Sequence, residues 1–262
     1  MIESLHSPHI ARVKALLGSR GKKERRESGL FIAEGMQFLR EASQPNSKPT
    51  IDTLYVTAAG RAKALASKID IDHLNVIDVT DAVMREMGET VTPQGILGLC
   101  ETPETSIADI GISDSARFIY LMEIQDPGNA GTIIRTADAT GFSGVITSEN
   151  SVDIYSPKVV RASAGSLWHL PVYEKVDLQA LISRWPNPNI FALATEGQES
   201  LLNVDCAGAS LWIFGNEARG LSDLEFSSKV RSVRIPMAGN AESLNLAAAA
   251  AIVMFRVTSA SL

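Results

Sequence analysis

The sequence contains only two cysteines, Cys100 and Cys206, among its 262 residues. Two cysteines are too few for a disulfide framework, and these two are not spaced as metal ligands, so we expect no metal site. The chain does not open with a basic segment and an apolar core, so we expect no secretory signal. The longest strongly apolar stretch, 244–255, includes Asn245 and falls short of the ~20 residues that a membrane span needs. These absences favour a cytoplasmic protein over a secreted or membrane-embedded one.

Positive charge is scarce overall and is concentrated in one place. The net charge of −6 argues against a protein that coats nucleic acid indiscriminately. Residues 1–26 nevertheless carry seven basic and two acidic side chains, a local charge of +5, so the remaining residues carry −11. A basic arm on an acidic body suits a protein that meets a polyanion at one place, although a solvated helix face and a polar turn would carry the same charges.

Helical and strand-like segments alternate along the chain, which indicates an α/β fold. Residues 101–116 are polar and rich in small residues, so we expect domains at 1–105 and 117–262 joined by a linker at 106–116. In the first part we expect strands at 30–33, 53–57, 76–79 and 95–99 and helices at 9–19, 36–42, 58–69 and 81–87. In the second we expect strands at 118–124, 144–147, from 172, 190–195, 211–214 and 230–235 and helices at 129–140, 157–164, 178–185 and 243–258. The later strands are short and apolar on both faces, which is typical of a buried parallel sheet.

Three segments place glycine, asparagine and charge directly after apolar strands, where open α/β sheets bind ligands. In the first segment, 125–138, an Asp-Pro-Gly turn precedes Asn129, which could cap the helix that follows. Arg135 comes six residues later, just under two turns along that helix. An amide and a guanidinium together could hold a phosphate or a ribose; a capping asparagine and an unrelated surface arginine are the alternative.

The second segment is Leu211 to Ser222, in which Gly215 and Gly220 permit close approach of the backbone to a ligand. Between the two glycines, Asn216 and Glu217 offer hydrogen-bond donors and acceptors. The segment is not the G-x-G-x-x-G fingerprint, so it gives little support to a dinucleotide fold. A plain turn is the alternative interpretation.

The third segment runs from Ile235 to Ala251. An irregular loop brings Ser243 and Asn245 to the start of a run of five alanines. Consecutive alanines keep a helix thin enough to pass close to another backbone. A high-propensity helix with ordinary caps would show the same pattern.

In this order and spacing, the three segments resemble the signature motifs of the SpoU/TrmH branch of the SPOUT RNA methyltransferases. The family's motif N-x-G-x-x-x-R is matched by Asn129, Gly131 and Arg135. Its motif G-N-E-x-x-G is matched by Gly215, Asn216, Glu217 and Gly220. Its motif I-P-M-x-G-x-x-x-S-L-N is matched by Ile235, Pro236, Met237, Gly239, Ser243, Leu244 and Asn245. The resemblance covers about residues 116–258. Residues 23–35 resemble, more loosely, the opening of the small substrate-binding domain that precedes many of these enzymes, a fold shared with some RNA-binding ribosomal proteins.

The resemblance implies 2′-O-methylation of a ribose in structured RNA, with S-adenosylmethionine as methyl donor. It also implies a homodimer and a deep trefoil knot in the C-terminal domain. The catalytic residues that it implies are Arg135, Asn129, Glu217, Ser243 and Asn245. The cofactor-binding residues are Thr195, Gly197, Phe214, Gly215, Asn216, Gly220, Ile235, Pro236, Met237, Ser243 and Leu244. The expected RNA-binding residues in the basic arm are Arg20, Lys22, Lys23, Arg25 and Arg26.

Arg135 corresponds to the family's catalytic residue, and the resemblance implies that it faces the cofactor site of the partner subunit. A guanidinium is effectively never deprotonated, so we expect Arg135 to bind a phosphate and polarise the 2′-hydroxyl, with phosphate or water accepting the proton. Large-subunit rRNA is the expected substrate, because the extra N-terminal domain accompanies rRNA-directed members more often. A tRNA methyltransferase, a catalytically silent RNA-binding or ribosome-assembly factor and, with less support, a nucleotide-dependent dehydrogenase remain alternatives.

Overall fold

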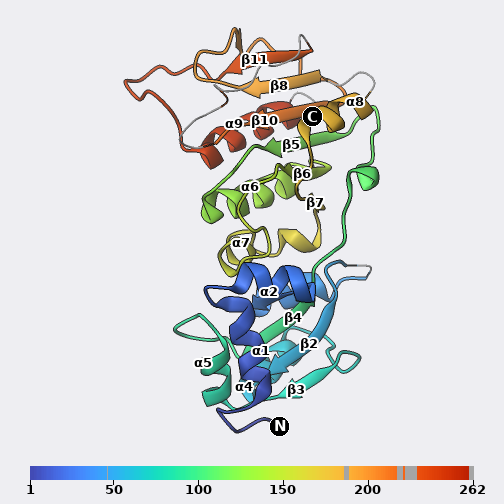
Figure 1. The fold of residues 1–262 in the computed structure, drawn as a ribbon, viewed down its shortest axis with the longest axis vertical. Coiled ribbons are helices and arrows are strands. Elements are labelled where there is room, and N and C mark those ends of the chain that lie inside the picture. Colours follow the sequence, from blue (N-terminus) through green and yellow to red (C-terminus); the bar gives the residue numbers. More distant parts are fainter. Residues whose placement is uncertain (46, 186–188, 217–220, 222–228, 260–262) are drawn as a thin grey trace. The chain divides into compact units, whose positions relative to one another are not determined.

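A computed structural model describes residues 1–45, 47–185, 189–216, 221 and 229–259 (Figure 1). The chain forms two compact units, of which the first contains Met1–Glu104 and Asp153–His169 and the second contains Thr105–Val152 and Leu170–Leu262. The domain boundaries expected from the sequence stay a prediction. Among the helices within the described ranges, none has the length and apolar character that crossing a membrane requires.

The first unit is built on a four-stranded sheet in the order β1-β4-β2-β3. Its strands are β1 (Leu30–Glu34), β2 (Ile51–Val56), β3 (Val76–Asp78) and β4 (Ile96–Glu101), and its first helices are α1 (Pro8–Leu17), α2 (Gly21–Ser28), α3 (Met36–Ala42), α4 (Ala58–Ala66) and α5 (Asp81–Met87). β4 pairs antiparallel with β1 and β2, whereas β2 and β3 run parallel. Ile10, Val13 and Leu16 of α1 recur at helical spacing and are buried in one core cluster with α5. The small α/β unit expected before the parallel sheet is therefore present.

The sequence predicts a helix at 9–19 and a basic arm, but no helix at the position of α2. Its eight residues include no large apolar side chain, so hydrophobic periodicity carried no signal. The helix ends at Gly29, whose φ of 67° is one that glycine adopts without strain. Arg25 is the one buried charged residue of α2, and its Nε and Nη2 donate to Asp153 Oδ2 at 2.9 and 2.7 Å.

Asp153–His169 belongs to the first unit although the residues on either side of it form the second. This segment contains α7 (Pro157–Ala162) and a short 3₁₀ helix, η2 (Ser166–Trp168). The Trp168 ring lies 6.0 Å from Phe31 and 5.7 Å from Phe38, measured between ring centroids. The Trp168 indole also donates to the Pro49 carbonyl at 2.9 Å. The segment thus supplies an aromatic anchor to the core of the N-terminal unit.

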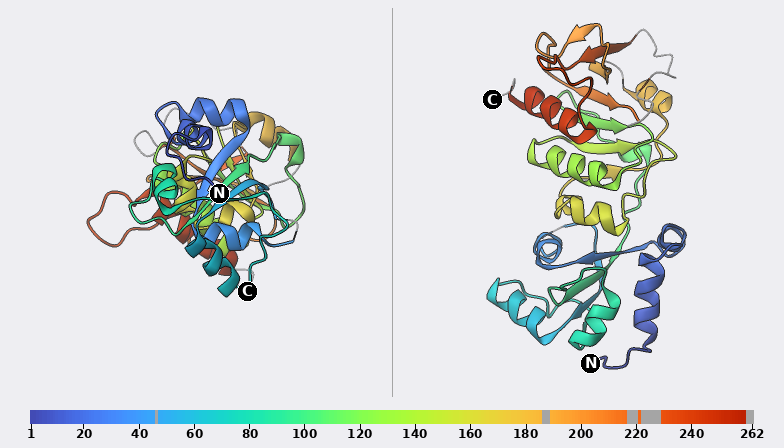
Figure 2. Two further views of the ribbon diagram at one scale, coloured as in Figure 1. Left: turned by 90° about the horizontal axis from the view of Figure 1, so that it is seen from below. Right: turned by 90° about the vertical axis from the view of Figure 1, so that its left-hand side faces the viewer.

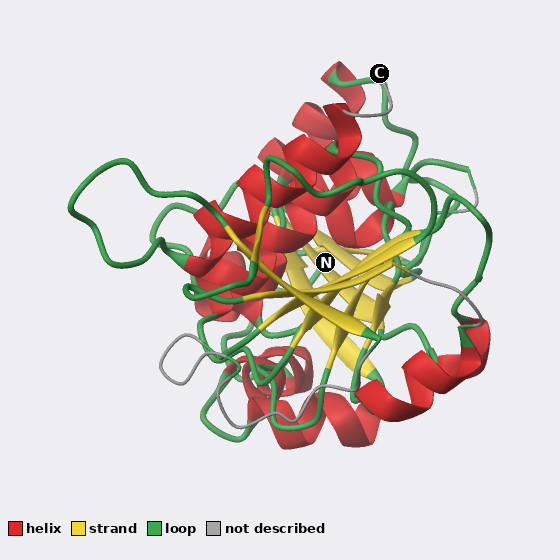
Figure 3. Cartoon of the chain, turned by 90° about the horizontal axis from the view of Figure 1, so that it is seen from above, coloured by secondary structure: helices red, strands yellow, loops and turns green. Residues whose placement is uncertain are grey.

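The second unit contains a seven-stranded sheet in the order β7-β6-β5-β10-β8-β11-β9. Each pair of neighbouring strands in the described part of this sheet is parallel, as the apolar strands predicted. The strands are β5 (Arg117–Leu121), β6 (Gly144–Thr147), β7 (Val172–Tyr173), β8 (Asn189–Leu193), β9 (Glu199–Ser200), β10 (Ser210–Phe214) and β11 (Val230–Arg234). The helices are η1 (Ile107–Asp109), α6 (Pro127–Ala139), α8 (Leu178–Arg184) and α9 (Leu246–Ser259). Figure 3 shows helices on both faces of this sheet.

Helices α6 and α9 pack side by side on one face of the parallel sheet (Figure 2). Ala247 and Ala250 of α9 are buried, which fits the prediction that the alanine run lets this helix pass close to its neighbour. At the far end, the Thr258 hydroxyl donates to the Thr140 carbonyl at 2.9 Å. This packing fixes the start of α9 near the start of α6, where two of the sequence motifs lie.

Candidate active site

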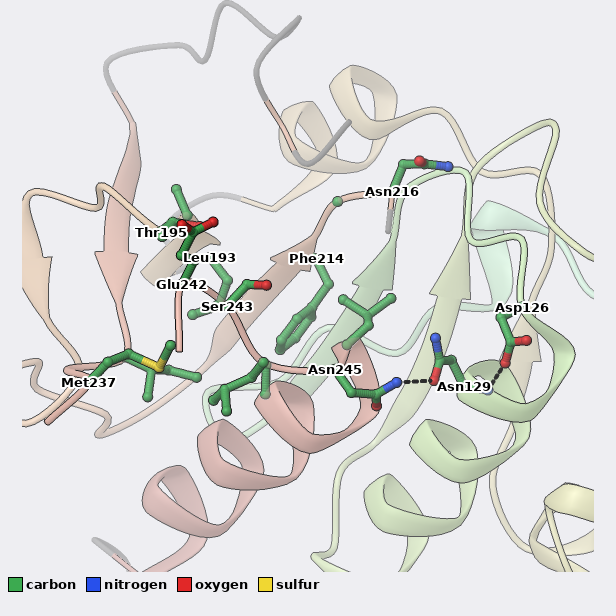
Figure 4. Close-up of a pocket in the computed structure, with 16 residues that line it drawn as sticks. Asp126, Asn129, Leu193, Thr195, Phe214, Asn216, Met237, Glu242, Ser243 and Asn245 are labelled. Carbon is green, nitrogen blue, oxygen red and sulfur yellow. Dashed lines mark hydrogen bonds between the residues drawn. The ribbon is translucent and has the colours of Figure 1, made fainter. Parts of the chain in front are cut away.

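A cavity of about 560 Å³ opens where β5, β8, β10 and β11 end (Figure 4). Parallel strands present their carboxyl ends at the same edge of a sheet, which is where such sheets bind ligands. The volume is within the range of about 300–1,000 Å³ that is usual for small-molecule sites. The residues that line it are Asp126, Asn129, Leu193, Ala194, Thr195, Phe214, Gly215, Asn216, Ile235, Met237, Glu242, Ser243, Leu244, Asn245, Leu246 and Ala249. All three sequence motifs therefore contribute to one cavity.

The first motif enters the cavity through the amino-terminal turn of α6. The helix begins at Pro127, a favoured first residue, and the Asp126 side chain caps it by accepting from the Asn129 backbone N–H at 2.7 Å. The prediction that Asn129 caps this helix is therefore wrong. Asp126 takes that role, which leaves the Asn129 side chain to contact the third motif.

Asn245 joins the third motif to the first. Its Oδ1 accepts from the backbone N–H groups of Ala247 at 2.9 Å and Ala248 at 3.3 Å, so that Asn245 caps α9. Its Nδ2 donates to Asn129 Oδ1 at 3.0 Å. The helix thus begins at Leu246, three residues later than the sequence predicted, because Asn245 and not an earlier residue supplies the cap.

Replacing Asn245 separates these two roles. We expect Asn245→Ala to lower the free energy of unfolding by about 1 kcal/mol, because the cap is lost. Asn245→Asp keeps a capping oxygen but has no amide to donate to Asn129, so stability should be retained while methyl transfer falls. Urea unfolding and a methyl-transfer assay on both variants test this. Equal destabilisation by both substitutions would show that the cap is not what Asn245 contributes.

The second motif is tied to the loop that follows β5. The Asn216 amide donates to the Glu123 carbonyl at 2.8 Å, and the Met122 N–H donates to the Phe214 carbonyl at 2.9 Å. Gly215 lines the cavity between these two anchors and brings its backbone to the cavity wall. Glu217 and Gly220, both predicted from the sequence, lie outside the described residues.

The predicted residues Gly197 and Pro236 are not among those that line the cavity. A Cβ atom on Gly197 would lie 2.3 Å from the backbone carbon of Val233, so this glycine allows the loop after β8 to pack directly on β11. Thr195, two residues earlier, does line the cavity. In this structure Gly197 therefore serves packing against β11 and is not part of the cavity lining.

Arg135 lies on α6 but is exposed and does not line this cavity. It is on the same helix as Asn129, almost two turns further on. Within one chain, the structure therefore brings together Asn129, Ser243 and Asn245, and leaves the arginine at the surface.

The sequence motifs did not point to every lining residue. Six further residues line the cavity, namely Asp126, Leu193, Ala194, Glu242, Leu246 and Ala249. Glu242 is at an unspecified position of the third motif, directly before Ser243, and Asp126 lies three residues before the first motif begins. The other four are small or aliphatic, and nothing in their local sequence distinguishes them from core residues.

The five basic residues predicted to bind RNA differ in their burial. Arg20, Lys22, Lys23 and Arg26 are exposed, whereas Arg25 is buried. Its guanidinium also donates to the Leu16 carbonyl. We therefore remove Arg25 from the set of residues expected to bind RNA.

Comparisons with known proteins follow the same division of the chain. The SpoU rRNA Methylase family matches residues 116–255, and the MRM3-like substrate binding domain matches residues 10–98. The chain is 28% identical over 239 residues to the 23S rRNA (guanosine(2553)-2′-O)-methyltransferase RlmP of Bacillus subtilis, covering 90% of this chain and 91% of that protein. It is 30% identical over 251 residues to the 23S rRNA (uridine(2479)-2′-O)-methyltransferase of Streptomyces viridochromogenes, covering 92% and 86%.

A solved structure is similar over the whole chain. The AdoMet-bound rRNA methyltransferase of Sinorhizobium meliloti superimposes with a TM-score of 0.86 at 30% identity, covering 100% of this chain and 98% of that one. The resemblance seen in the three motifs is thus confirmed over more than half of the chain by the family match and over all of it by the fold. The protein belongs to the SpoU rRNA methylase family.

Proposed function

We propose that this protein transfers the methyl group of S-adenosylmethionine to a ribose 2′-oxygen of large-subunit rRNA, and that it does so in the cytoplasm. The observation that carries the proposal is the convergence of three motifs, more than 100 residues apart at their extremes, on one cavity at the carboxyl edge of a parallel sheet. Two relatives that match most of the chain are named as 23S rRNA 2′-O-methyltransferases, which supports this substrate class.

The lining of the cavity fits S-adenosylmethionine. Leu193, Phe214 and Leu244 offer apolar surface for an adenine ring, and Thr195 and Ser243 offer hydroxyl groups for its polar edges and for the ribose. Gly215 has no side chain, so its backbone can approach the cofactor closely. When bound, this cofactor supplies a methyl group that its sulfonium already activates.

The chain's own residues then have to position the ribose hydroxyl and assist loss of its proton. Alignment of reacting groups can contribute up to about 7–11 kcal/mol of barrier lowering. The hydrogen-bonded pair Asn129–Asn245 supplies polar groups at one side of the cavity that suit this task. Arg135 would bind the adjacent phosphate and polarise the 2′-hydroxyl, because its guanidinium forms two parallel hydrogen bonds to phosphate.

Arg135 lies outside the cavity of its own chain, and this supports a homodimer in which it serves the cavity of the partner subunit. The exposed face of α9 carries two large apolar side chains, Ile252 and Phe255, which are 42% and 71% exposed and lie one turn apart. Because α6 packs beside α9, we propose that these two helices form the subunit contact. The trefoil knot expected from the resemblance is consistent with this family.

We assign RNA binding to residues 1–105 and methyl transfer to residues 117–262. The exposed bases on and beside α2, namely Arg20, Lys22, Lys23 and Arg26, would contact RNA phosphates. Structured RNA displays its 2′-hydroxyls in a shallow groove, so recognition of shape and backbone suffices to select a site.

Mapping of 2′-O-methyl groups on rRNA and tRNA from cells with and without the protein tests the proposal. We expect one large-subunit rRNA ribose to lose its methyl group when the protein is absent. If a tRNA ribose loses its methyl group instead, the substrate is tRNA and not large-subunit rRNA. An unchanged set of marks, together with no methyl transfer in vitro, would favour a catalytically silent assembly factor.

A further inference from the structure

The charged side chains among the described residues that line the cavity are all acidic. Among the described residues that line it, two are acidic, Asp126 and Glu242, and none is basic. An acidic cavity wall lowers the free energy of a cation and raises that of an anion, because charges interact across the low-dielectric protein more strongly than across water. The two carboxylates differ in what else they do.

Asp126 already has a structural task, since its Oδ1 accepts from the Asn129 backbone N–H at the start of α6. Glu242 has no such task. It is exposed, it stands in the irregular loop between β11 and α9, and no side-chain hydrogen bond or ion pair joins it to a residue that the structure describes. Figure 4 shows Glu242 on the side of the cavity away from Asp126 and Asn129.

We propose that Glu242 is a specificity-determining residue that favours the cationic methyl donor over its neutral product. This inference rests on the proposed function. S-adenosylmethionine carries a positive charge at sulfur, whereas S-adenosylhomocysteine, which remains after methyl transfer, is an uncharged thioether. The adenine, the ribose, the amino group and the carboxylate are the same in both. A carboxylate that acts on the sulfur charge therefore distinguishes donor from product and lets the product leave after each turnover.

The competing explanation is that Glu242 accepts a hydrogen bond from a ribose hydroxyl or from the amino group. Those groups are common to donor and product, so that role would change both affinities by the same factor. The ratio of the two dissociation constants separates the explanations. Glu242→Gln suits this measurement because it removes the charge and keeps the size and an accepting oxygen.

Isothermal titration of the full-length protein with S-adenosylmethionine and S-adenosylhomocysteine gives this ratio. We expect Glu242→Gln to weaken donor binding by about three- to tenfold relative to product binding, the size of a partly screened charge pair. Sinefungin, which carries an amine in place of the methyl-sulfonium group, should follow the donor. Glu242→Asp should keep most of the preference, and added salt should reduce it in the unsubstituted protein.

Glu149→Gln is the matched control, since Glu149 is an exposed acid of the same unit that does not line the cavity. It changes the net charge equally and should leave the ratio unaltered. An unchanged ratio in Glu242→Gln, or the same shift in the control, overturns the inference. If the unsubstituted protein binds neither compound, the proposed function itself fails, so the two failures are distinguishable.

Discussion

Replacement of Arg135 by alanine should lower methyl transfer by about a hundred- to a thousandfold, the usual loss when one preorganised electrostatic group is removed from a reacting centre. S-adenosylmethionine should still bind, because Arg135 is exposed and does not line the cavity of its own chain. Calorimetry for binding and transfer of a tritiated methyl group to rRNA for activity measure the two effects separately.

Two controls sharpen this result. Arg135→Lys keeps the charge but loses the planar fork that grips phosphate, so it should recover only part of the activity. Arg184→Ala removes an exposed arginine from α8 in the same unit and should leave transfer unchanged. Parallel loss of cofactor binding and activity in Arg135→Ala would remove Arg135 from the reacting centre.

The proposed action across a dimer makes a distinct prediction for mixed subunits. Arg135→Ala and a cavity variant such as Gly215→Val should each be inactive alone. When they are mixed, one site of each hybrid dimer combines an intact cavity with an intact arginine, and activity should return. If stably mixed subunits show no complementation, Arg135 acts at the cavity of its own chain.

Arg25→Ala should lower the free energy of unfolding by about 3–5 kcal/mol, because it leaves a buried charge without its partner. The Arg25 and Asp153 side chains are 8% and 15% exposed, and Asp153 would lose the two hydrogen bonds that it accepts from the guanidinium. The Leu16 carbonyl would lose a donor as well. Chemical denaturation measures the loss, and amide hydrogen exchange should show it at α2 and at Asp153–His169.

Arg26→Ala is the matched control, because it removes an exposed arginine from the next position of the same helix. It should change stability by no more than about 0.5 kcal/mol and should weaken RNA binding instead. Replacing both buried partners, as in Arg25→Met with Asp153→Leu, should cost less than Arg25→Ala alone. Equal stability of Arg25→Ala and Arg26→Ala would contradict a structural role for the buried pair.

Local sequence predicted secondary structure well where an apolar pattern and a helix cap indicate the same element. The helix Asp81–Met87 has the bounds that the sequence predicted, because the Thr80 side chain caps it by accepting from the Val83 N–H and its apolar residues share one face. The helix Met36–Ala42 and the strand Gly144–Thr147 also have the predicted bounds. Helix α2 was not predicted, because it is anchored by a buried arginine and has no stripe of apolar side chains.

The sequence by itself determined the chemistry that is available. It placed asparagine, glycine and arginine in a fixed order after apolar strands, and it showed that those strands were suited to a parallel sheet buried on both faces. Their spacing sufficed to indicate the family. These properties are readable because each depends on residues that are close together in the chain.

Only the tertiary structure decided which of these residues meet. The hydrogen bond between Asn129 and Asn245 spans 116 residues, and the buried pair of Arg25 and Asp153 spans 128. A charged side chain can bind RNA when it is exposed, and it stabilises the fold when another segment buries it. That segment lies far away in the sequence. Burial is a property of packing between distant segments, so no local pattern could have assigned Arg25 to the core or Glu242 to the cavity wall.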